Sequence, residues 1–133
     1  MSKTWIYFGI FIDDASKVKN INALLNHNIK IHDDWKYFNH HMTIAFNNGS
    51  EECKKLYEYY KKYFGKVTNI TIDGIGISDD AIAVRVRFGN PIANKIPHIT
   101  MATPKNGKPV NSIKITNWFD IEPYEIRGTI NAF

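Results

Sequence analysis

The chain has 133 residues, of which 44% are hydrophobic and 23% are charged, the composition of an ordinary folded protein. This length suits one domain with a core of its own, so we expect a single domain over residues 1–133. The 17 Lys and Arg residues exceed the 13 Asp and Glu residues, giving a formal net charge of +4. This excess favours anionic partners such as nucleotides or RNA and is too small for a protein that coats nucleic acid.

Two features of the sequence bear on the compartment. Cys53 is the only cysteine, so no disulfide can form within the chain, and a reducing compartment fits best. The apolar segment 5–12 is too short for a secretory signal and is followed directly by Asp13 and Asp14. No stretch approaches the length of a membrane span. We therefore expect a cytoplasmic protein with no membrane contact and no obligatory protein partner.

The first part of the chain predicts a strand, a helix and another strand. Residues 5–12 are mostly β-branched or aromatic, which favours a buried strand. Asp13–Ser16 offers turn and N-cap chemistry for a short helix. Residues 26–39 are polar and irregular, and strand character returns at His41–Phe46. The apolar residues of the expected helix are Val18, Ile21, Leu24 and Leu25.

The second predicted helix has the clearest pattern in the sequence. Ser50 is a suitable N-cap, apolar residues then recur at helical spacing, and Gly65 is a typical C-terminal stop. Beyond it the sequence predicts strands separated by turns, and the segment 103–109 has the composition of a mobile loop. The expected strands cover residues 67–72, 81–88, 98–102, 112–115, 118–121 and 125–130.

Two tetrapeptides match each other: His41-Met42-Thr43-Ile44 and His98-Ile99-Thr100-Met101. Side chains alternate between the faces of a strand, so His and Thr would share one face while the apolar residues enter the core. His40 would by the same alternation face away from His41 and have a structural role. Two motif strands side by side would place two imidazoles and two hydroxyls around one cleft. With one such strand in each half, we expect an α+β fold of two lobes.

This set of groups suits cleavage of a phosphodiester. The reaction needs a base for the attacking hydroxyl or water, an acid for the leaving oxygen, and donors for the phosphoryl charge. His41 and His98 would supply the base and the acid near neutral pH, and the sequence does not decide which is which. Thr43 and Thr100 would bond the non-bridging oxygens, since residues i and i+2 lie roughly 6.6 Å apart on a strand. Such a site needs no cofactor and no metal.

The paired His-x-Thr motifs resemble those of the 2H phosphoesterase superfamily. Its members include 2′,3′-cyclic phosphodiesterases, RNA 2′,5′-ligase-like proteins, the cyclic phosphodiesterase domain of fungal and plant tRNA ligases, and phage enzymes that destroy cyclic oligonucleotide immune signals. The resemblance implies a bilobal α+β fold, with antiparallel sheets around a central cleft and flanking helices. It also implies that His41 and His98 are the acid–base pair and that Thr43 and Thr100 hold phosphate. The small size and the closing stretch 118–130 are most similar to the tRNA-ligase-like branch, which includes phage anti-CBASS nucleases.

The function that we expect is metal-independent hydrolysis of a cyclic nucleotide or cyclic oligonucleotide, as in a phage enzyme that counters signalling in the host cytoplasm. A 2′,3′-cyclic phosphodiesterase of RNA repair or end processing, and a 2′,5′-oligoadenylate phosphodiesterase, are alternatives with the same chemistry. An alternative of another class is a non-catalytic module that binds RNA or nucleotides. The motifs could also be a coincidence of strand-favouring threonines, or part of a metal site, although no third ligand has recognisable spacing.

Two aromatic residues are candidates for contacts with a base. Tyr7 shares a face of the first strand with Gly9 and Phe11, and would stack on a base beside the cleft while the glycine leaves room for substrate. Packing in the core is the alternative for Tyr7. Trp35 lies in the polar stretch before the first motif. It would either contact a base at the mouth of the cleft or hold that loop in place through local hydrophobic contacts.

Three charged residues are candidates for polar contacts with the substrate. Lys105, which together with Lys108 flanks Asn106-Gly107 in the loop after the second motif, would grip an anionic substrate from a lid, or simply face water, as would Lys108. Glu125 and Arg127 are two residues apart on the last predicted strand. They would orient a catalytic histidine or contact a base, and exposure to solvent is the alternative for both.

Overall fold

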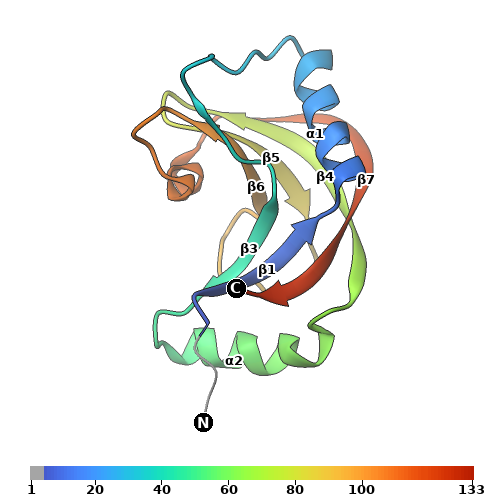
Figure 1. Ribbon diagram of the computed structural model, residues 1–133, viewed down its shortest axis with the longest axis vertical. Coiled ribbons are helices and arrows are strands. Elements are labelled where there is room, and N and C mark those ends of the chain that lie inside the picture. Colours follow the sequence, from blue (N-terminus) through green and yellow to red (C-terminus); the bar gives the residue numbers. More distant parts are fainter. Residues whose placement is uncertain (1–4) are drawn as a thin grey trace.

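Residues 5–133 are described by a computed structural model, in which one antiparallel sheet closes into a barrel with two helices beside it (Figure 1). Helix α1 lies along the outside of β7, and α2 crosses the opposite end of the barrel. The elements, including the 3₁₀ turns η1 and η2, are β1 (Tyr7–Ile12), α1 (Asp14–Asn26), β2 (Lys36–Tyr37), β3 (His41–Phe46), α2 (Glu51–Tyr60), η1 (Lys61–Tyr63), β4 (Val67–Ile77), β5 (Ile82–Arg87), β6 (His98–Thr103), η2 (Pro109–Lys114) and β7 (Trp118–Ala132).

The sheet is a single closed one, where separate sheets around a cleft were expected. Its strand order is β2-β6-β3-β1-β7-β4-β5, and β5 pairs with β6 to close the ring. The reason lies in β7, predicted as two short strands and observed as one strand of 15 residues. This strand is long enough to pair with β1 on one edge and with β4 on the other. It thereby joins the two halves of the chain, and the α+β character is retained.

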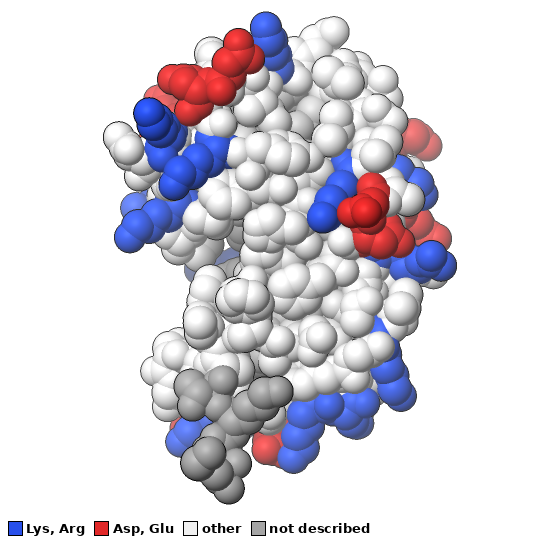
Figure 2. All heavy atoms as spheres, in the orientation of Figure 1, with Lys and Arg blue, Asp and Glu red and all other residues white. Residues whose placement is uncertain are grey.

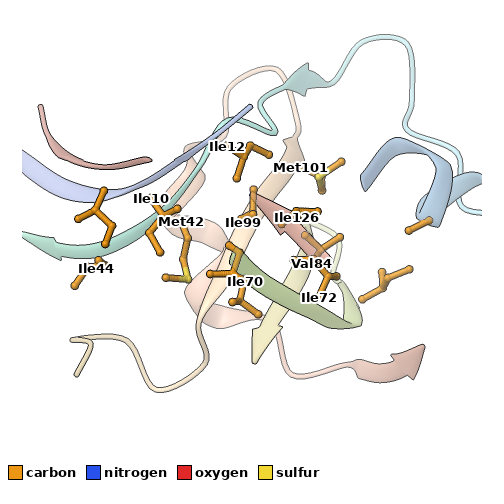
Figure 3. Packing of buried hydrophobic residues seen from close by; sticks show 14 of the residues in the cluster. Ile10, Ile12, Met42, Ile44, Ile70, Ile72, Val84, Ile99, Met101 and Ile126 are labelled. Atoms are coloured by element: carbon orange, nitrogen blue, oxygen red, sulfur yellow. The ribbon is translucent and has the colours of Figure 1, made fainter. Parts of the chain in front are cut away.

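The inside of the barrel is filled with aliphatic side chains. Figure 3 shows them pointing toward one another from strands of both halves. In β3, Met42 and Ile44 are fully buried while His41 and Thr43 are half-buried, which is the predicted alternation. Since a barrel this small has its interior occupied by side chains, a binding site has to lie outside it. The labelled residues are Ile10, Ile12, Met42, Ile44, Ile70, Ile72, Val84, Ile99, Met101 and Ile126.

The helix α1 is bound to the barrel by polar as well as apolar side chains. Of the apolar residues expected to face the core, Leu24 is buried in it, whereas Val18, Ile21 and Leu25 are exposed. The other buried positions are Ser16, Asn20 and Ala23. The Ser16 hydroxyl accepts from the backbone N–H of Arg127 at 2.7 Å and donates to the Arg127 carbonyl at 3.1 Å. Hydrogen bonds to a strand backbone thus supplement the burial of Ala23 and Leu24, which is why helical periodicity identified only part of the buried face.

Asn39 is the central residue of a buried hydrogen-bond network between α1 and the strands. Its side-chain oxygen accepts from Asn20 Nδ2 at 2.9 Å, and its Nδ2 donates to the Lys17 carbonyl at 3.0 Å and to the Tyr37 hydroxyl at 2.6 Å. Asn20 in turn accepts from the Tyr124 hydroxyl at 2.7 Å. Asn39 has a φ of 62°, a conformation that Asn tolerates better than most residues. The network therefore fixes the turn by which the chain enters β3.

The second motif strand is joined to the first by few hydrogen bonds. Met42 and Ile99 form the one paired position between β3 and β6, and just before it Phe38 and Asn39 donate to β6 carbonyls at 2.8 and 2.9 Å. After β6 the chain turns and forms η2, where residues 112–115 were predicted as a strand.

None of the helices among residues 5–133 combines the length and apolar character needed to cross a bilayer.

We predict that Gly9→Ala destabilises the fold, because a Cβ at Gly9 would lie 2.2 Å from the Met42 carbonyl oxygen. Gly9 thus admits the β3 backbone, and its expected role of leaving room for substrate is not what this geometry shows. Overpacking of this kind costs about 1–3 kcal/mol, measurable as a lower free energy of unfolding in urea. Gly89→Ala is the matched control, since nothing lies within 4 Å of its added Cβ. Equal stability of the two variants would contradict the prediction.

Candidate active site

The four motif side chains meet on the outer face of the barrel. Met42 and Ile99 point inward from β3 and β6, so the residues on either side of them point outward. His41, Thr43, His98 and Thr100 all line one cavity of about 360 Å³. The structure therefore brings together the two histidines and two threonines that the sequence singled out.

The remaining lining of this cavity is mostly apolar. Aromatic rings and residues of η2 both contribute to it. In the view of Figure 2, charged side chains gather toward the edges, and the middle of the surface is largely uncharged. Among residues 5–133, Lys108 is the one lysine or arginine of the lining, which apart from the motif residues also comprises Tyr7, Phe38, His40, Phe46, Asn94, Pro109, Val110 and Ile113.

The imidazole of His98 has its tautomer fixed by the backbone. Its Nδ1 lies 2.7 Å from the carbonyl oxygen of Ile96, and because a carbonyl only accepts, Nδ1 carries the hydrogen. Neutral His98 therefore has an unprotonated Nε2. Burial lowers the pKa of His98, against the smaller opposing effect of that hydrogen bond. At neutral pH the His98 ring is thus a neutral base with a free lone pair.

His41 lies among aromatic rings. The centroid of its ring is 4.9 Å from that of Tyr7, 5.5 Å from that of Phe11 and 4.6 Å from that of His40. Burial, with smaller contributions from the charges of His40 and His98, lowers the pKa of His41 to about 4. Both motif histidines are therefore neutral at pH 7 in the free protein. A bound phosphate would favour protonation of either ring, because an anion nearby raises the pKa of histidine.

The two threonines differ in how their hydroxyls are engaged. Thr100 donates to the Pro109 carbonyl at 3.2 Å and has the Ser112 hydroxyl 2.8 Å from its oxygen. Its single hydrogen is thus bound to the η2 segment. Within residues 5–133, the Thr43 hydroxyl makes no hydrogen bond. Thr43 is consequently free to donate to a ligand oxygen. Thr100 would first have to give up its hydrogen bond to the η2 segment before it could donate to a ligand.

His40 lines the cavity as well, although strand alternation placed it on the face opposite His41. The alternation fails because the strand begins at His41 and the preceding Asn39 has a left-handed backbone. His40 consequently turns to the same side as its neighbour, and its ring is exposed at the rim. An asparagine directly before the pair was the available signal, since Asn is enriched at positive φ.

Of the five residues predicted to contact substrate, Tyr7 is the one that lines this cavity. Trp35 is half-buried and packs against the hydrophobic core, with the ring of His32 at 5.6 Å. Lys105 is exposed in the turn after β6, and the cavity is lined by Lys108, three residues further on. The sequence indicated a basic loop here but not which lysine faces the site.

Glu125 and Arg127 lie on a different surface from the motif residues. They line a groove beside α1, where Arg127 forms an ion pair with Asp13 at 3.5 Å. The reason is the length of β7: this part of the strand pairs with β4 at Thr71 and Asn69. From this position neither side chain orients a motif histidine.

A second cavity, of about 440 Å³, adjoins the first at His98. The two cavities share Asn94, His98 and Ile113, and the second extends to Trp118, whose ring centroid is 6.4 Å from that of His98. A ligand group bound next to His98 could therefore extend into either cavity. Among residues 5–133, no three His, Cys, Asp or Glu side chains are placed to hold a metal ion together.

Comparison with solved structures shows that this fold is shared with another protein. One similar structure is that of a fungal RNA kinase, which matches with a TM-score of 0.66 and 14% sequence identity. The match covers all of this chain and 46% of that chain, so this protein corresponds to about half of its neighbour. Identity this low shows a common fold alone. No family model and no curated protein matches the sequence.

We predict that His41 makes the protein less stable in mild acid. Its pKa is about 4 in the folded state against 6.5 without the fold, so between these values the unfolded chain binds a proton that the folded chain does not. The free energy of unfolding therefore falls as the pH drops from about 7 toward 4, by about 2 kcal/mol at pH 5 from this group. Urea unfolding at about pH 7.5 and 5 measures the difference.

The variant His41→Phe keeps an aromatic ring among its aromatic neighbours and removes the titrating group, so it should lose that part of the pH dependence. His32→Phe is the control, because His32 is exposed and outside the cavity. If wild type and His41→Phe lose the same stability on acidification, His41 does not titrate as described.

Proposed function

We propose that this protein is a metal-independent phosphodiesterase of the 2H phosphoesterase type. The proposal depends on one observation, that both histidines and both threonines of the paired motifs line a single cavity. A module that only binds RNA or nucleotides has no need of two imidazoles beside two hydroxyls. Acid–base cleavage of a phosphodiester needs two groups that exchange protons, together with donors for the phosphoryl oxygens.

The protonation states suggest a role for each histidine. The bare Nε2 of His98 accepts the proton of the attacking hydroxyl, either a neighbouring 2′-hydroxyl or a water. His41 then donates to the leaving oxygen. The Thr43 hydroxyl bonds a non-bridging oxygen, and the ammonium group of Lys108 offsets phosphoryl charge at the cavity edge. Thr100 first serves to hold η2 against β6 through its bonds to Pro109 and Ser112.

The shape of the site favours a diester that carries a nucleoside on each side of the phosphorus. The aromatic rings of Tyr7, Phe38 and Phe46 in the first cavity suit stacking on a base. The second cavity, with Trp118, lies across His98 and offers space for another base. We therefore place a cyclic oligonucleotide first among the substrates. A phage enzyme that removes host signalling nucleotides would act on this class.

A second candidate is a 2′,3′-cyclic phosphodiesterase that acts on RNA ends. The fold likeness to a fungal RNA kinase is what favours it, because a kinase of this kind acts on RNA. A 2′,5′-oligoadenylate phosphodiesterase would use the same groups. These candidates differ in the linkage cleaved and in the number of bases held, so a substrate panel separates them.

We predict that chelator-treated protein cleaves one class of the panel formed by cyclic dinucleotides, cyclic trinucleotides, 2′,3′-cyclic mononucleotides and 2′,5′-oligoadenylate. His41→Ala and His98→Ala should each lower turnover by about 10²–10⁴-fold, the usual contribution of a general acid or base, with ligand affinity within a few-fold. His32→Ala, outside the cavity, is the control and should leave turnover unchanged.

Unchanged turnover in both active-site variants would refute the proposal. Activity that the chelator abolishes and added metal restores would refute its metal-free mechanism. Binding of a nucleotide without cleavage of any panel member would favour the non-catalytic module.

A further inference from the structure

His40 and His41 are neighbours in sequence, and their rings are in direct contact. Their Nδ1 atoms are 2.5 Å apart, and the ring planes are 22° from parallel. Such a contact requires one hydrogen between the two nitrogens, because two lone pairs would repel and two N–H groups would collide. The neutral pair consequently has opposite tautomers. The ring whose Nδ1 accepts the shared hydrogen must carry its own hydrogen on Nε2.

The two rings have different access to water. His41 is half-buried between the rings of Tyr7 and Phe11 and faces the cavity. His40 is exposed at the rim, with the ring of Phe38 at 5.9 Å in an edge-on arrangement. His40 is therefore the member of the pair that exchanges protons freely with solvent. A substrate in the cavity would cover His41 and leave the outer edge of His40 in water.

We infer that His40 is a positioning residue that sets the tautomer of His41 and resupplies it with protons, which rests on the proposed phosphodiesterase function. In the resting pair, His40 donates its Nδ1 hydrogen to Nδ1 of His41. His41 then has its own hydrogen on Nε2, complementary to the bare Nε2 of His98. One histidine is thereby prepared to give a proton and the other to take one.

The proton balance of the transfer closes within this pair. The Nε2–H bond of His41 breaks as its proton goes to the leaving oxygen. The Nδ1–H bond of His40 breaks as that proton goes to Nδ1 of His41, and Nε2 of His40 takes one proton from solvent. One proton enters and one leaves, and both rings end neutral with their tautomers exchanged. When Nε2 of His41 later takes a proton from an incoming water, the same steps in reverse restore the resting pair.

The charges around the pair explain why such a resupply is useful. Partial burial and the positive charge of Lys17 on α1 lower the pKa of His40. His41 faces Tyr7 on β1 and His98 on β6. Burial raises the pKa of Tyr7 above its usual value and lowers the pKa of His98, so both side chains are uncharged at neutral pH. Among residues 5–133, Lys108 is the lysine or arginine that lines the cavity, and no carboxylate of this part of the chain lines it to stabilise an imidazolium. A neutral His41 that donates a proton and receives one from His40 therefore avoids a charged ring.

The tautomers are tested by NMR of protein with ¹⁵N-labelled histidine, free of substrate and near neutral pH. We expect His41 to be protonated on Nε2 and His98 on Nδ1, and the preference of His41 to be lost in His40→Phe. Protonation of His41 on Nδ1 in the wild type would overturn the inference. Because this measurement needs no substrate, its failure is distinct from a failure of the phosphodiesterase proposal, which absence of turnover on the panel would show.

The proton resupply is tested by pH–rate profiles of His40→Asn and His40→Phe. An Asn amide can donate to Nδ1 of His41 but cannot pass a proton on, so we expect kcat to fall about 10-fold with Asn and about 100-fold with Phe, and KM to change little. The alkaline limb should move to lower pH in both, because His41 must then be charged to donate. Added imidazole should restore part of the kcat of His40→Ala. A loss that is equal at every pH, without rescue, would show a merely structural role and overturn the inference.

Discussion

The buried side-chain amide of Asn39 is the constraint on which the arrangement of the site depends. It binds α1 through Asn20 and the Lys17 carbonyl, while its own backbone takes a left-handed turn. The hydrogen bonds offset the free-energy cost of burying an amide, and they hold the backbone of Asn39 in the conformation from which β3 begins. Beyond it, both His40 and His41 face the cavity. A residue without the amide would lose the turn and the helix contact together, so fold and chemistry are linked at this position.

The closed barrel decides where a site can form. Its interior is packed with isoleucine, valine and methionine side chains, so the outer face between β3 and β6 is what remains for chemistry (Figure 3). Those two strands share one paired position, Met42 with Ile99, and diverge beyond it. The η2 segment, bonded to Thr100 through Pro109 and Ser112, closes the far side of the cavity. The cavity therefore lies where β3 and β6 are joined by a single paired position and η2 covers the outer face.

Electrostatics in the cavity keep the motif histidines neutral at pH 7. Burial lowers the pKa of both, and among residues 5–133 the lining contains one lysine and no carboxylate. In the proposed function, Lys108 and the Thr43 hydroxyl would be the groups that attract a phosphate. In the proposed mechanism, the tautomer of His98 and the shared hydrogen of His40 and His41 would set the direction of proton transfer, with Nε2 of His98 bare and Nε2 of His41 protonated.

The sequence by itself determined the motif strands, the shared face of His and Thr on each of them, and the second helix with its Ser50 cap, because strand alternation and helix capping are local. The matching motifs led us to expect that the two strands lie together, and the pairing of β3 with β6 is what brings the four side chains to one cavity. The sequence did not determine the closure of the sheet, the polar attachment of α1, or the side to which His40 turns. It also did not separate Lys108 from Lys105, or place Glu125 and Arg127 away from the site. Each of these depends on contacts between residues far apart in the chain: β7 pairs on both edges, Ser16 bonds the Arg127 backbone, and Asn39 holds a turn whose partners lie on α1. Only the tertiary structure decides such contacts, since no local pattern encodes the partner.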